Sequence, residues 1–226
     1  LVSATIKEKV KQEVLSLKEQ DVVSCLAVIL VGNNPASRVY VNNKKTACEF
    51  CEIRSLEYTM PEETTQDELL ELIAKLNADK SVNGILVQLP LPRHISEDAV
   101  IAAIDPQKDV DAFHPVNVGK IMQGDYDFVP CTPAGIMEML AFEGIEIAGK
   151  TCVVIGRSNI VGRPLANLLS LKDDPGDCTV TICHSHTKNI EFFTKQADII
   201  IAALGSPGFV KGDMVREGAV IVEGGA

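Results

Sequence analysis

The segment Thr151–Pro164, with the sequence TCVVIGRSNIVGRP, constrains the fold more than any other part of the chain. Thr151–Ile155 is apolar and β-branched, which is typical of a strand buried on both faces of a parallel sheet. Gly156 ends this run, and the leucines within Ile160–Ser170 then repeat with helical spacing. A strand, a tight glycine turn and a helix N-terminus present free backbone N–H groups and a helix dipole, which attract pyrophosphate. The segment therefore predicts a dinucleotide-binding loop, with an ordinary structural turn as the alternative.

This loop and the strand that follows it together indicate which nucleotide binds. Ser158 and Val161 stand at the second and third glycine positions of a G-x-G-x-x-G fingerprint, and Gly162 comes just after them. The strand Cys178–Cys183 is followed by HSHTK, where a site for NAD would usually carry an acidic residue for the ribose 2′-hydroxyl. The hydroxyls and potential cations found there, with Arg157 in the loop, suit a 2′-phosphate instead. The chain therefore predicts NADP, with a solvated strand end that lacks acids as the alternative.

Composition places the chain among ordinary globular proteins of one large or two small domains. It has 226 residues, of which 46% are hydrophobic and 23% are charged. We expect no membrane span, because no apolar run approaches about 20 residues, and we see no secretory signal. The formal net charge of −10 argues against a nucleic-acid-binding surface.

The seven cysteines lack the regular spacing of a disulfide framework, which indicates free thiols in a reducing cytoplasm. Cys48 and Cys51 form a C-x-x-C pair, but they lie late in an expected helix, so packing is a better interpretation than redox chemistry. Cys183, His184 and His186 resemble part of a zinc site, but no second pair of ligands has suitable spacing. We therefore expect no metal site.

The remaining pattern predicts two α/β blocks with parallel sheets, because strands and helices alternate along the chain. An active cleft is expected between the blocks, at the carboxyl ends of their strands. The first block is expected to contain a helix around Ile6–Leu17, strand Cys25–Val31, a helix from Asn34 to about Cys51, strand Ile53–Met60, a helix after the capping box Thr65–Glu68, strand Gly84–Val87 and a short helix over Ser96–Ile104. The second is expected to follow an ordered loop over Asp105–Pro133, with a helix from Thr132 to about Phe142 and strands near Thr151, Cys178, Ala197 and Ala219.

Three polar positions of the first block carry candidate chemistry. Tyr40 and Lys44 are four residues apart on one expected helix, so they share a face and can tune proton transfer, or they form a surface pair. Gln88 follows a wholly apolar strand at its carboxyl end, where sites collect in open α/β sheets. The carboxylates of Asp109 and Asp111 suit bidentate pairing with an amidine-like N–H pair on a heterocycle.

Together these motifs resemble the bifunctional methylenetetrahydrofolate dehydrogenase/methenyltetrahydrofolate cyclohydrolase family. VGNNPASRVYVNNK, GILVQLPLP, DPQKDVDAFHPVNVGK, PCTPAG and GRSNIVGRPLANLL follow one another in the family's order. The resemblance covers essentially the whole chain. It implies a folate-binding catalytic domain over residues 1–131 and a Rossmann-like NADP-binding domain over residues 132–226, around a cleft.

The resemblance also implies roles for individual residues. Lys44 would be the catalytic lysine, Tyr40 would pack on the folate, and Gln88 would orient Lys44. Asp111 would hold the pterin through its N–H edge, and Ser185 would lie beside the 2′-phosphate. Further folate contacts are expected from Leu89 and Pro90, and further NADP contacts from Thr132, Gly156, Arg157, Ser158, Ile160, Val161 and His184.

The implied chemistry has two steps. Hydride first leaves the one-carbon bridge of 5,10-methylenetetrahydrofolate for the nicotinamide, and a delocalised methenyl cation remains. Water then attacks this cation to give 10-formyltetrahydrofolate. A lysine that faces a cation is expected to have a lowered pKa, so neutral Lys44 could accept the proton of the water.

Several positions depart from the family's pattern. Ala112 stands where the family usually has glycine, and its methyl group could shift the loop that holds the pterin. Glu52 replaces the usual glycine after the Tyr40 helix, so this helix is expected to end in another conformation. Glu223 and Gly224 alter the last strand, which glycine should weaken.

The family resemblance also implies features outside these residues. Family members continue past Ala226 into a final helix that returns to the folate domain, and they form a homodimer through the cofactor domain, here through the edge strand Cys178–Cys183. Two other interpretations stay open: a different two-domain NAD(P) dehydrogenase that acts on a small acid, and a binding homologue without catalytic activity.

Overall fold

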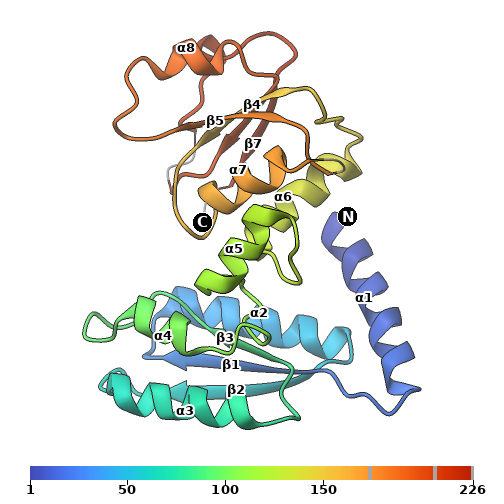
Figure 1. The fold of residues 1–226 in the computed structure, drawn as a ribbon, viewed down its shortest axis with the longest axis vertical. Helices are drawn as coiled ribbons and strands as arrows, with labels where there is room; N and C mark the ends of the chain where they lie inside the picture. The colour runs from blue at the N-terminus through green and yellow to red at the C-terminus, as the bar shows by residue number, and fades with distance from the viewer. Residues whose placement is uncertain (173–174, 206–207, 225–226) are drawn as a thin grey trace. The chain divides into compact units, whose positions relative to one another are not determined.

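The structure, a computed structural model, describes residues 1–172, 175–205 and 208–224. The chain divides into two compact units, Leu1–Pro115 and Val116–Ala226, which Figure 1 shows in blue to green and in green to red. Each unit is a parallel sheet with helices on both faces, so the predicted α/β class is confirmed. No helix in the described part of the chain is both long and apolar enough to cross a membrane.

The sheet of the first unit has three parallel strands in the order β2-β1-β3. Asn34 caps α2, because its side chain accepts hydrogen bonds from the backbone N–H groups of Ala36 and Ser37. Thr65 and Glu68 form the predicted capping box of α3. The elements are α1 (Val2–Lys18), β1 (Cys25–Val31), α2 (Pro35–Phe50), β2 (Arg54–Met60), α3 (Gln66–Ala78), β3 (Gly84–Val87) and α4 (Glu97–Ala103), which confirms the order predicted for this block.

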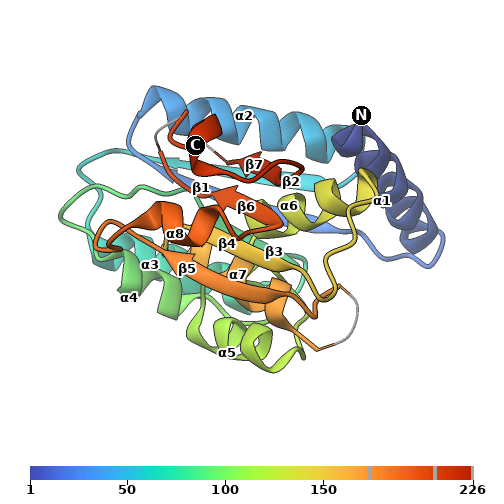
Figure 2. The same cartoon turned by 90° about the horizontal axis from the view of Figure 1, so that it is seen from above.

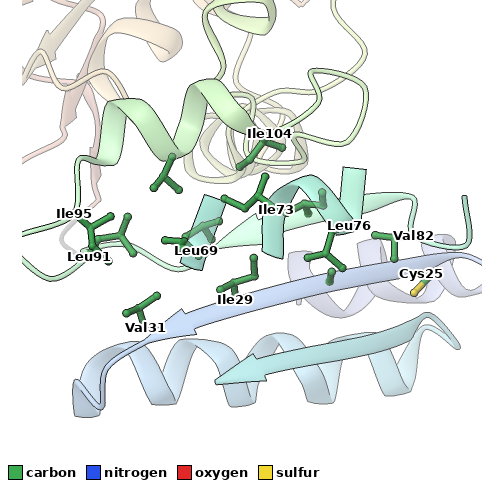
Figure 3. Close-up of a cluster of buried hydrophobic side chains, with 14 residues drawn as sticks. Cys25, Ile29, Val31, Leu69, Ile73, Leu76, Val82, Leu91, Ile95 and Ile104 are labelled. Atoms are coloured by element: carbon green, nitrogen blue, oxygen red, sulfur yellow. The ribbon is translucent and has the colours of Figure 1, made fainter. Parts of the chain in front are cut away.

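Strand β1 is buried on both faces, and alternate residues pack into different clusters. Figure 3 shows the larger cluster, in which Ile29 of β1 packs with Leu69 and Ile73 of α3 and with Ile104 at the end of α4. On the other face, Val28 and Leu30 pack against Val41 of α2. This burial explains why β1 is a continuous apolar run, and it fixes α2 over the sheet.

The end of α2 differs from the expectation. Glu52 does adopt the left-handed conformation, with φ +62°, although glycine is the usual residue there. The N–H groups of Ile53 and Glu52 donate to the carbonyl groups of Cys48 and Glu49, at 2.9 and 3.2 Å. This is a complete Schellman motif. The expectation of another conformation was therefore wrong, because these two hydrogen bonds hold the turn, and Glu52 also forms an ion pair with Lys18 at 2.7 Å.

The region Asp105–Pro133 contains a helix where the sequence predicted a loop. α5 (Pro115–Gln123) begins with proline at its first position, which is favourable because that residue needs no backbone donor. Asn117 and Ile121, one turn apart, are its buried residues. The glycine and proline content of the region concealed this helix, which is stabilised by burial of one stripe rather than by helix propensity.

The second unit has four parallel strands in the order β5-β4-β6-β7, seen side by side in Figure 2. α6 and α7 cover one face of the sheet, and α8 packs on the other. The predicted strands are confirmed, with β5 at an edge. The elements are α6 (Cys131–Phe142), β4 (Thr151–Ile155), α7 (Gly162–Ser170), β5 (Thr179–Cys183), α8 (Ile190–Thr194), β6 (Ile199–Ala202), η1 (Gly212–Met214) and β7 (Val220–Glu223).

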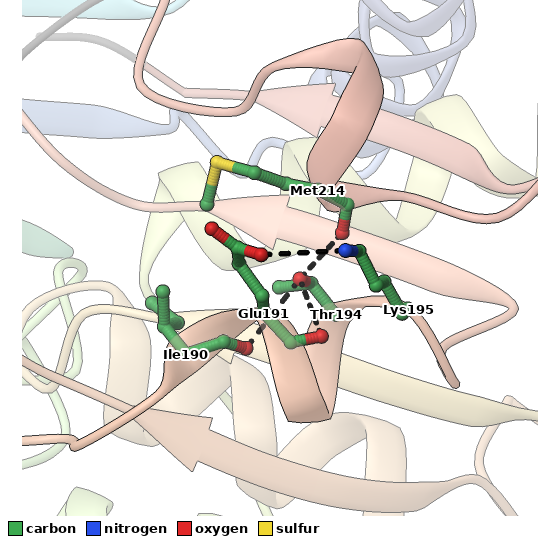
Figure 4. A network of polar contacts seen from close by, with 5 residues as sticks. All are labelled: Ile190, Glu191, Thr194, Lys195 and Met214. Atoms are coloured by element: carbon green, nitrogen blue, oxygen red, sulfur yellow. Dashed lines mark hydrogen bonds and ion pairs between the residues drawn. The ribbon is translucent and has the colours of Figure 1, made fainter.

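A buried threonine joins α8 to η1, two elements that the sequence pattern did not predict. Thr194 is fully buried, and its hydroxyl group donates to the carbonyl oxygen of Met214 at 2.6 Å (Figure 4). Lys195 and Glu191 form an exposed ion pair at 3.3 Å on the same helix. The chain after β5 is therefore held by a contact between residues that are distant in sequence.

Candidate active site

Tyr40, Lys44 and Gln88 come together in the first unit. The Nζ atom of Lys44 donates a hydrogen bond to Oε1 of Gln88 at 2.8 Å, and it lies 5.9 Å from the centre of the Tyr40 ring. Lys44 and Gln88 are half-buried, whereas Tyr40 is 51% exposed, so its ring is available for stacking. Tyr40 and Lys44 are therefore not an isolated surface pair, because Gln88 joins them in one cluster.

Gln88 is fixed at both its backbone and its side chain. Its backbone N–H donates to the carbonyl oxygen of Ile29 at 2.8 Å, which places it at the carboxyl end of β3. Its Nε2 donates to the carbonyl oxygen of Leu89 at 2.8 Å. Since an amide group has one donor end and one acceptor end, this bond turns Oε1 toward Lys44. Gln88 therefore offers the lysine an acceptor of defined direction.

Asp111 adds a carboxylate whose charge is poorly solvated. Desolvation raises its pKa to about 6, and the charge of Asp109 contributes in the same direction, while the charge of Lys44 opposes the rise. Asp111, Asp109 and Leu89 line a cavity of about 10 Å³ whose other walls are apolar. Pro90 follows Leu89 through a cis peptide bond and is exposed. The structure thus brings together the folate-site residues expected from the sequence.

Ala112, next to Asp111, is fully buried and has a φ of +55°. Its N–H donates to the carbonyl oxygen of Asp109 at 3.2 Å. The loop therefore keeps the left-handed conformation that glycine adopts most easily, in spite of the methyl group.

The cofactor loop of the second unit needs glycine at two positions. Gly156 has a φ of +124°, and a Cβ atom on it would lie 2.5 Å from the carbonyl oxygen of Ala203. A Cβ atom on Gly162 would lie 2.3 Å from the carbonyl oxygen of Gly156. Gly162, not the residue at position 161, is therefore the glycine that allows the helix to pack closely on the strand. α7 begins at Gly162 rather than at Ile160, because Val161 has a non-helical backbone conformation and is the N-cap residue.

Ser158 shapes the start of α7. Its Oγ accepts hydrogen bonds from the N–H groups of Val161 and Gly162, at 3.1 and 3.3 Å. No described residue accepts a hydrogen bond from the N–H groups of Ser158 and Asn159. Arg157, Ser158 and Ile160 are exposed, and Val161 is half-buried. A loop of this kind fits a phosphate, because it combines free backbone donors, a helix N-terminus and a guanidinium group.

The turn after β5 is closed by its own residues. The backbone N–H of His184 donates to Oγ1 of Thr187 at 2.8 Å, and Nδ1 of His184 accepts from the N–H of His186 at 3.2 Å. Desolvation, followed by the charges of Arg157 and His186, lowers the pKa of His184. The lowered pKa makes His184 harder to protonate than a free imidazole, while its place on this turn beside Ser185 is the one expected of a cofactor contact. Ser185 is exposed on this turn.

The sequence also singled out Thr132 and the cysteine pair Cys48 and Cys51. Thr132 lies in the first turn of α6 and is exposed, and no hydrogen bond of the described residues joins it to the Gly156 loop. Cys48 and Cys51 are buried free thiols, and burial raises the pKa of Cys48. A thiol in this state is a packing residue.

Comparison with known proteins places this arrangement in a family. Residues 1–111 match the catalytic domain of tetrahydrofolate dehydrogenase/cyclohydrolase, and residues 130–226 match its NAD(P)-binding domain. The chain belongs to the tetrahydrofolate dehydrogenase/cyclohydrolase family. It is 58% identical over 224 residues to the bifunctional protein FolD of Acetivibrio thermocellus, covering 99% of this chain and 77% of that protein. The FolD of Agathobacter rectalis is 56% identical and covers 100% of this chain and 79% of its own.

Solved structures of the family have the same fold. The bifunctional FolD enzyme of Campylobacter jejuni superposes with a TM-score of 0.92 at 51% identity, covering 97% of this chain and 77% of that one. The enzyme of Trypanosoma brucei, solved with NADP cofactor and an inhibitor, has a TM-score of 0.90 at 36% identity and covers 97% of this chain and 75% of its own.

Proposed function

We propose that this chain oxidises 5,10-methylenetetrahydrofolate with NADP⁺ and hydrolyses the methenyl product to 10-formyltetrahydrofolate. The observation that carries this proposal is the hydrogen bond of 2.8 Å between Lys44 and Gln88 beside the exposed Tyr40 ring. Membership of the tetrahydrofolate dehydrogenase/cyclohydrolase family supports it. The other two interpretations, a different NAD(P) dehydrogenase and a binding homologue without activity, become outcomes of the assay below.

In the first unit, four residues bind the folate through three kinds of contact. The Tyr40 ring stacks on the pterin, and Leu89 and Pro90 provide apolar contact. The Asp111 carboxylate accepts two hydrogen bonds from the N–H edge of the pterin. Because Asp111 is charged only above about pH 6, folate binding is expected to strengthen as the pH rises through this value.

In the second unit, the residues present fit NADP. The N–H groups of Ser158 and Asn159 and the N-terminus of α7 receive the pyrophosphate, close to Gly156, Ile160 and Val161. Arg157 supplies a permanent charge. Ser185 and His184, after β5, lie where the ribose 2′-phosphate is expected, and Thr132 contributes from α6. The cofactor supplies the hydride acceptor, and the protein contributes binding and orientation.

For the oxidation, the contribution of the first unit is to hold the folate in a defined orientation. Tyr40 and Asp111 fix the plane and the rotation of the pterin, so the hydride leaves from a defined face. The product is a delocalised methenyl cation on the folate, and no protein side chain has to accept a proton in this step.

For the hydrolysis, a side chain must accept a proton from the attacking water. Lys44 is the candidate, because its amine is the basic group that hydrogen-bonds Gln88 at 2.8 Å beside the Tyr40 ring. Gln88 Oε1 accepts one N–H of the amine and thereby directs the nitrogen lone pair away from itself. Proton transfer from water to Lys44 then accompanies formation of the carbon–oxygen bond.

The same proposal covers the two domains, the dimer and the location of the enzyme in the cell. Residues 1–131 are the folate-binding catalytic domain and residues 132–226 the NADP-binding domain. Two copies pair through the exposed edge strand β5, and the enzyme works in the cytoplasm, where 10-formyltetrahydrofolate supplies purine biosynthesis. The position of β5 at the edge of its sheet supports this dimer, because its outer backbone groups are available for pairing.

The first test follows both products from 5,10-methylenetetrahydrofolate with NADP⁺ or NAD⁺. Reduced cofactor and 10-formyltetrahydrofolate with NADP⁺ are the expected result. Accumulation of the methenyl compound would contradict the role of Lys44, and activity only with NAD⁺ would contradict the Arg157 site. Binding of both ligands without turnover would leave a binding protein.

The second test is Lys44→Met, with Lys45→Met as the matched control. Cyclohydrolase activity is expected to fall by about 10²–10⁴-fold, the usual contribution of a general base, while dehydrogenase activity falls less. Lys45 is the next residue of α2 and is exposed, so its variant should keep both rates within roughly twofold. An equal loss of both activities in Lys44→Met would exclude a specific role in hydrolysis.

A further inference from the structure

Asp109 is a buried carboxylate that the proposed mechanism does not use. Its relative exposure is 2%, and it is the one charged residue among the buried polar residues of the described chain. A buried carboxylate is costly unless hydrogen bonds hold it, so its position requires an explanation.

The contacts of Asp109 close the loop that carries Asp111. Its Oδ2 accepts a hydrogen bond from the backbone N–H of His114 at 2.8 Å, and its carbonyl oxygen accepts from the N–H of Ala112 at 3.2 Å. Its backbone also pairs with Ile85 of β3. Asp109 therefore anchors the loop to the sheet at one end and binds the other end through its side chain.

This loop needs such an anchor. Ala112 has a φ of +55°, in the left-handed region that is unfavourable for alanine because its Cβ atom crowds the following carbonyl oxygen. Asp111 directly precedes Ala112, so the direction of its carboxylate depends on that conformation. The hydrogen bond from His114 to Asp109 spans the strained residue and holds it in place.

The two carboxylates also share one environment. Asp109 and Asp111 line the same cavity of about 10 Å³, whose other walls are apolar side chains such as Ile101 and Phe113. Lys44 and Asp109 are the charged groups that act on Asp111, with opposite effects on its pKa. The charge of Asp109 is therefore felt at Asp111 with little screening by water.

We propose that Asp109 is a positioning residue for Asp111: its buried carboxylate holds the folate-binding loop in shape, and its negative charge lies in the wall of the same small cavity as Asp111. This inference rests on the proposed function, because it concerns the carboxylate that meets the pterin. It assigns Asp109 no contact with the substrate.

The test compares Asp109→Asn with Asp109→Ala. An asparagine side chain still accepts a hydrogen bond from His114 but carries no charge, whereas alanine removes the acceptor as well. Asp105→Asn is the matched control, because Asp105 also accepts a backbone N–H in this region, from Gln107, and is not among the groups that shift the pKa of Asp111. Activity is followed as kcat/KM for 5,10-methylenetetrahydrofolate between pH 5 and pH 8.

The acid limb of the wild-type profile is expected near pH 6. Asp109→Asn should move this limb to lower pH and raise kcat/KM at pH 5.5 by roughly threefold. Asp109→Ala should raise KM by about tenfold with little change in kcat, because the loop loses a charged hydrogen bond. Asp105→Asn should match the wild type. If Asp109→Asn does not fold, Asp109→Glu should keep the acid limb near pH 6 and raise KM.

Two results would overturn the inference. One is an acid limb of Asp109→Asn that coincides with that of the wild type, and the other is an unchanged KM in Asp109→Ala. A readout without folate separates this failure from that of the proposed function. Asp109→Asn should also reduce the loss of folding stability between pH 4 and pH 7 that ionisation of Asp111 causes, whether or not the protein turns over folate.

Discussion

Ionisation of Asp111 provides a charge in the folate site and lowers the free energy of unfolding. Its pKa rises from 3.8 to about 6, chiefly through desolvation. Below about pH 4 the carboxyl group is protonated in the folded and in the unfolded chain, so it does not change the free energy of unfolding. As the pH rises toward 6, the unfolded chain ionises first and the folded state loses relative stability. Above pH 6 the whole loss of folding stability that the raised pKa causes is present.

Asp111→Asn is therefore expected to stabilise the protein at pH 7.5 by about 2 kcal/mol, since a shift of one pKa unit corresponds to about 1.4 kcal/mol and partial exposure reduces the sum. At pH 4 the variant and the wild type should have similar free energies of unfolding. The measurement is urea denaturation at both pH values. The same variant should bind folate more weakly, because the amide carries no charge.

A lower stability of Asp111→Asn at pH 7.5 would contradict this account. It would mean that the ionised carboxylate makes hydrogen bonds that outweigh its desolvation. Asp98→Asn in the first turn of α4 is a suitable control, since that carboxylate is exposed and should show no rise in stability at pH 7.5.

At the level of single residues, the sequence predicted the candidate site where local pattern carries the information. Lys44 and Tyr40 share a helix face, and Gln88 follows a strand, so their positions could be inferred from spacing. Spacing does not reveal that a Cβ atom at Gly162 would clash with Gly156. It also does not reveal the close approach of Gly156 to Ala203. Both depend on how the helix and the next strand pack.

At the level of elements, the predicted strands and capped helices formed because each has its own local signal. The apolar run of β1, the Asn34 cap of α2 and the capping box of α3 are examples. α5 has only proline at its first position as a local signal, and α8 has no side-chain cap. Both helices are short. Burial of Ile121 stabilises α5 and burial of Thr194 stabilises α8, because helix propensity alone is too weak.

The start of α7 gives a prediction at this scale. Gly162→Ala is expected to destabilise the protein by at least about 2 kcal/mol, because the new methyl group meets the backbone of Gly156, which cannot move as a side chain can. The affinity for NADP⁺ should fall at the same time, since the shifted backbone carries the donors for the pyrophosphate. Thermal unfolding and NADP⁺ titration measure the two effects.

Gly119→Ala is the matched control. Gly119 lies inside α5, and a Cβ atom there would meet nothing within 4 Å. Alanine should stabilise this helix by about 0.5–1 kcal/mol, because it restricts the unfolded chain more than glycine does. Equal effects of the two substitutions would show that the close approach at Gly162 does not constrain the loop.

At the level of the whole molecule, each unit has its own apolar clusters. Cys25–Val31 is at the centre of those in the first unit, and Cys152–Ile155 at the centre of those in the second. The expected sites follow the same division, with folate residues in the first unit and NADP residues in the second. A ligand that binds one unit should therefore stabilise mainly the cluster beneath its own site.

Hydrogen exchange with and without NADP⁺ measures this division. At 100 times the dissociation constant, NADP⁺ should stabilise the folded second unit by about 2.7 kcal/mol and slow the slowest amides of β4 and β6 by roughly 100-fold. The amides of β1 should change far less. Arg157→Ala should reduce the protection at equal NADP⁺ concentration, because the guanidinium no longer attracts phosphate. Equal protection of β1 and β4 would show instead that the two units open as one cooperative structure.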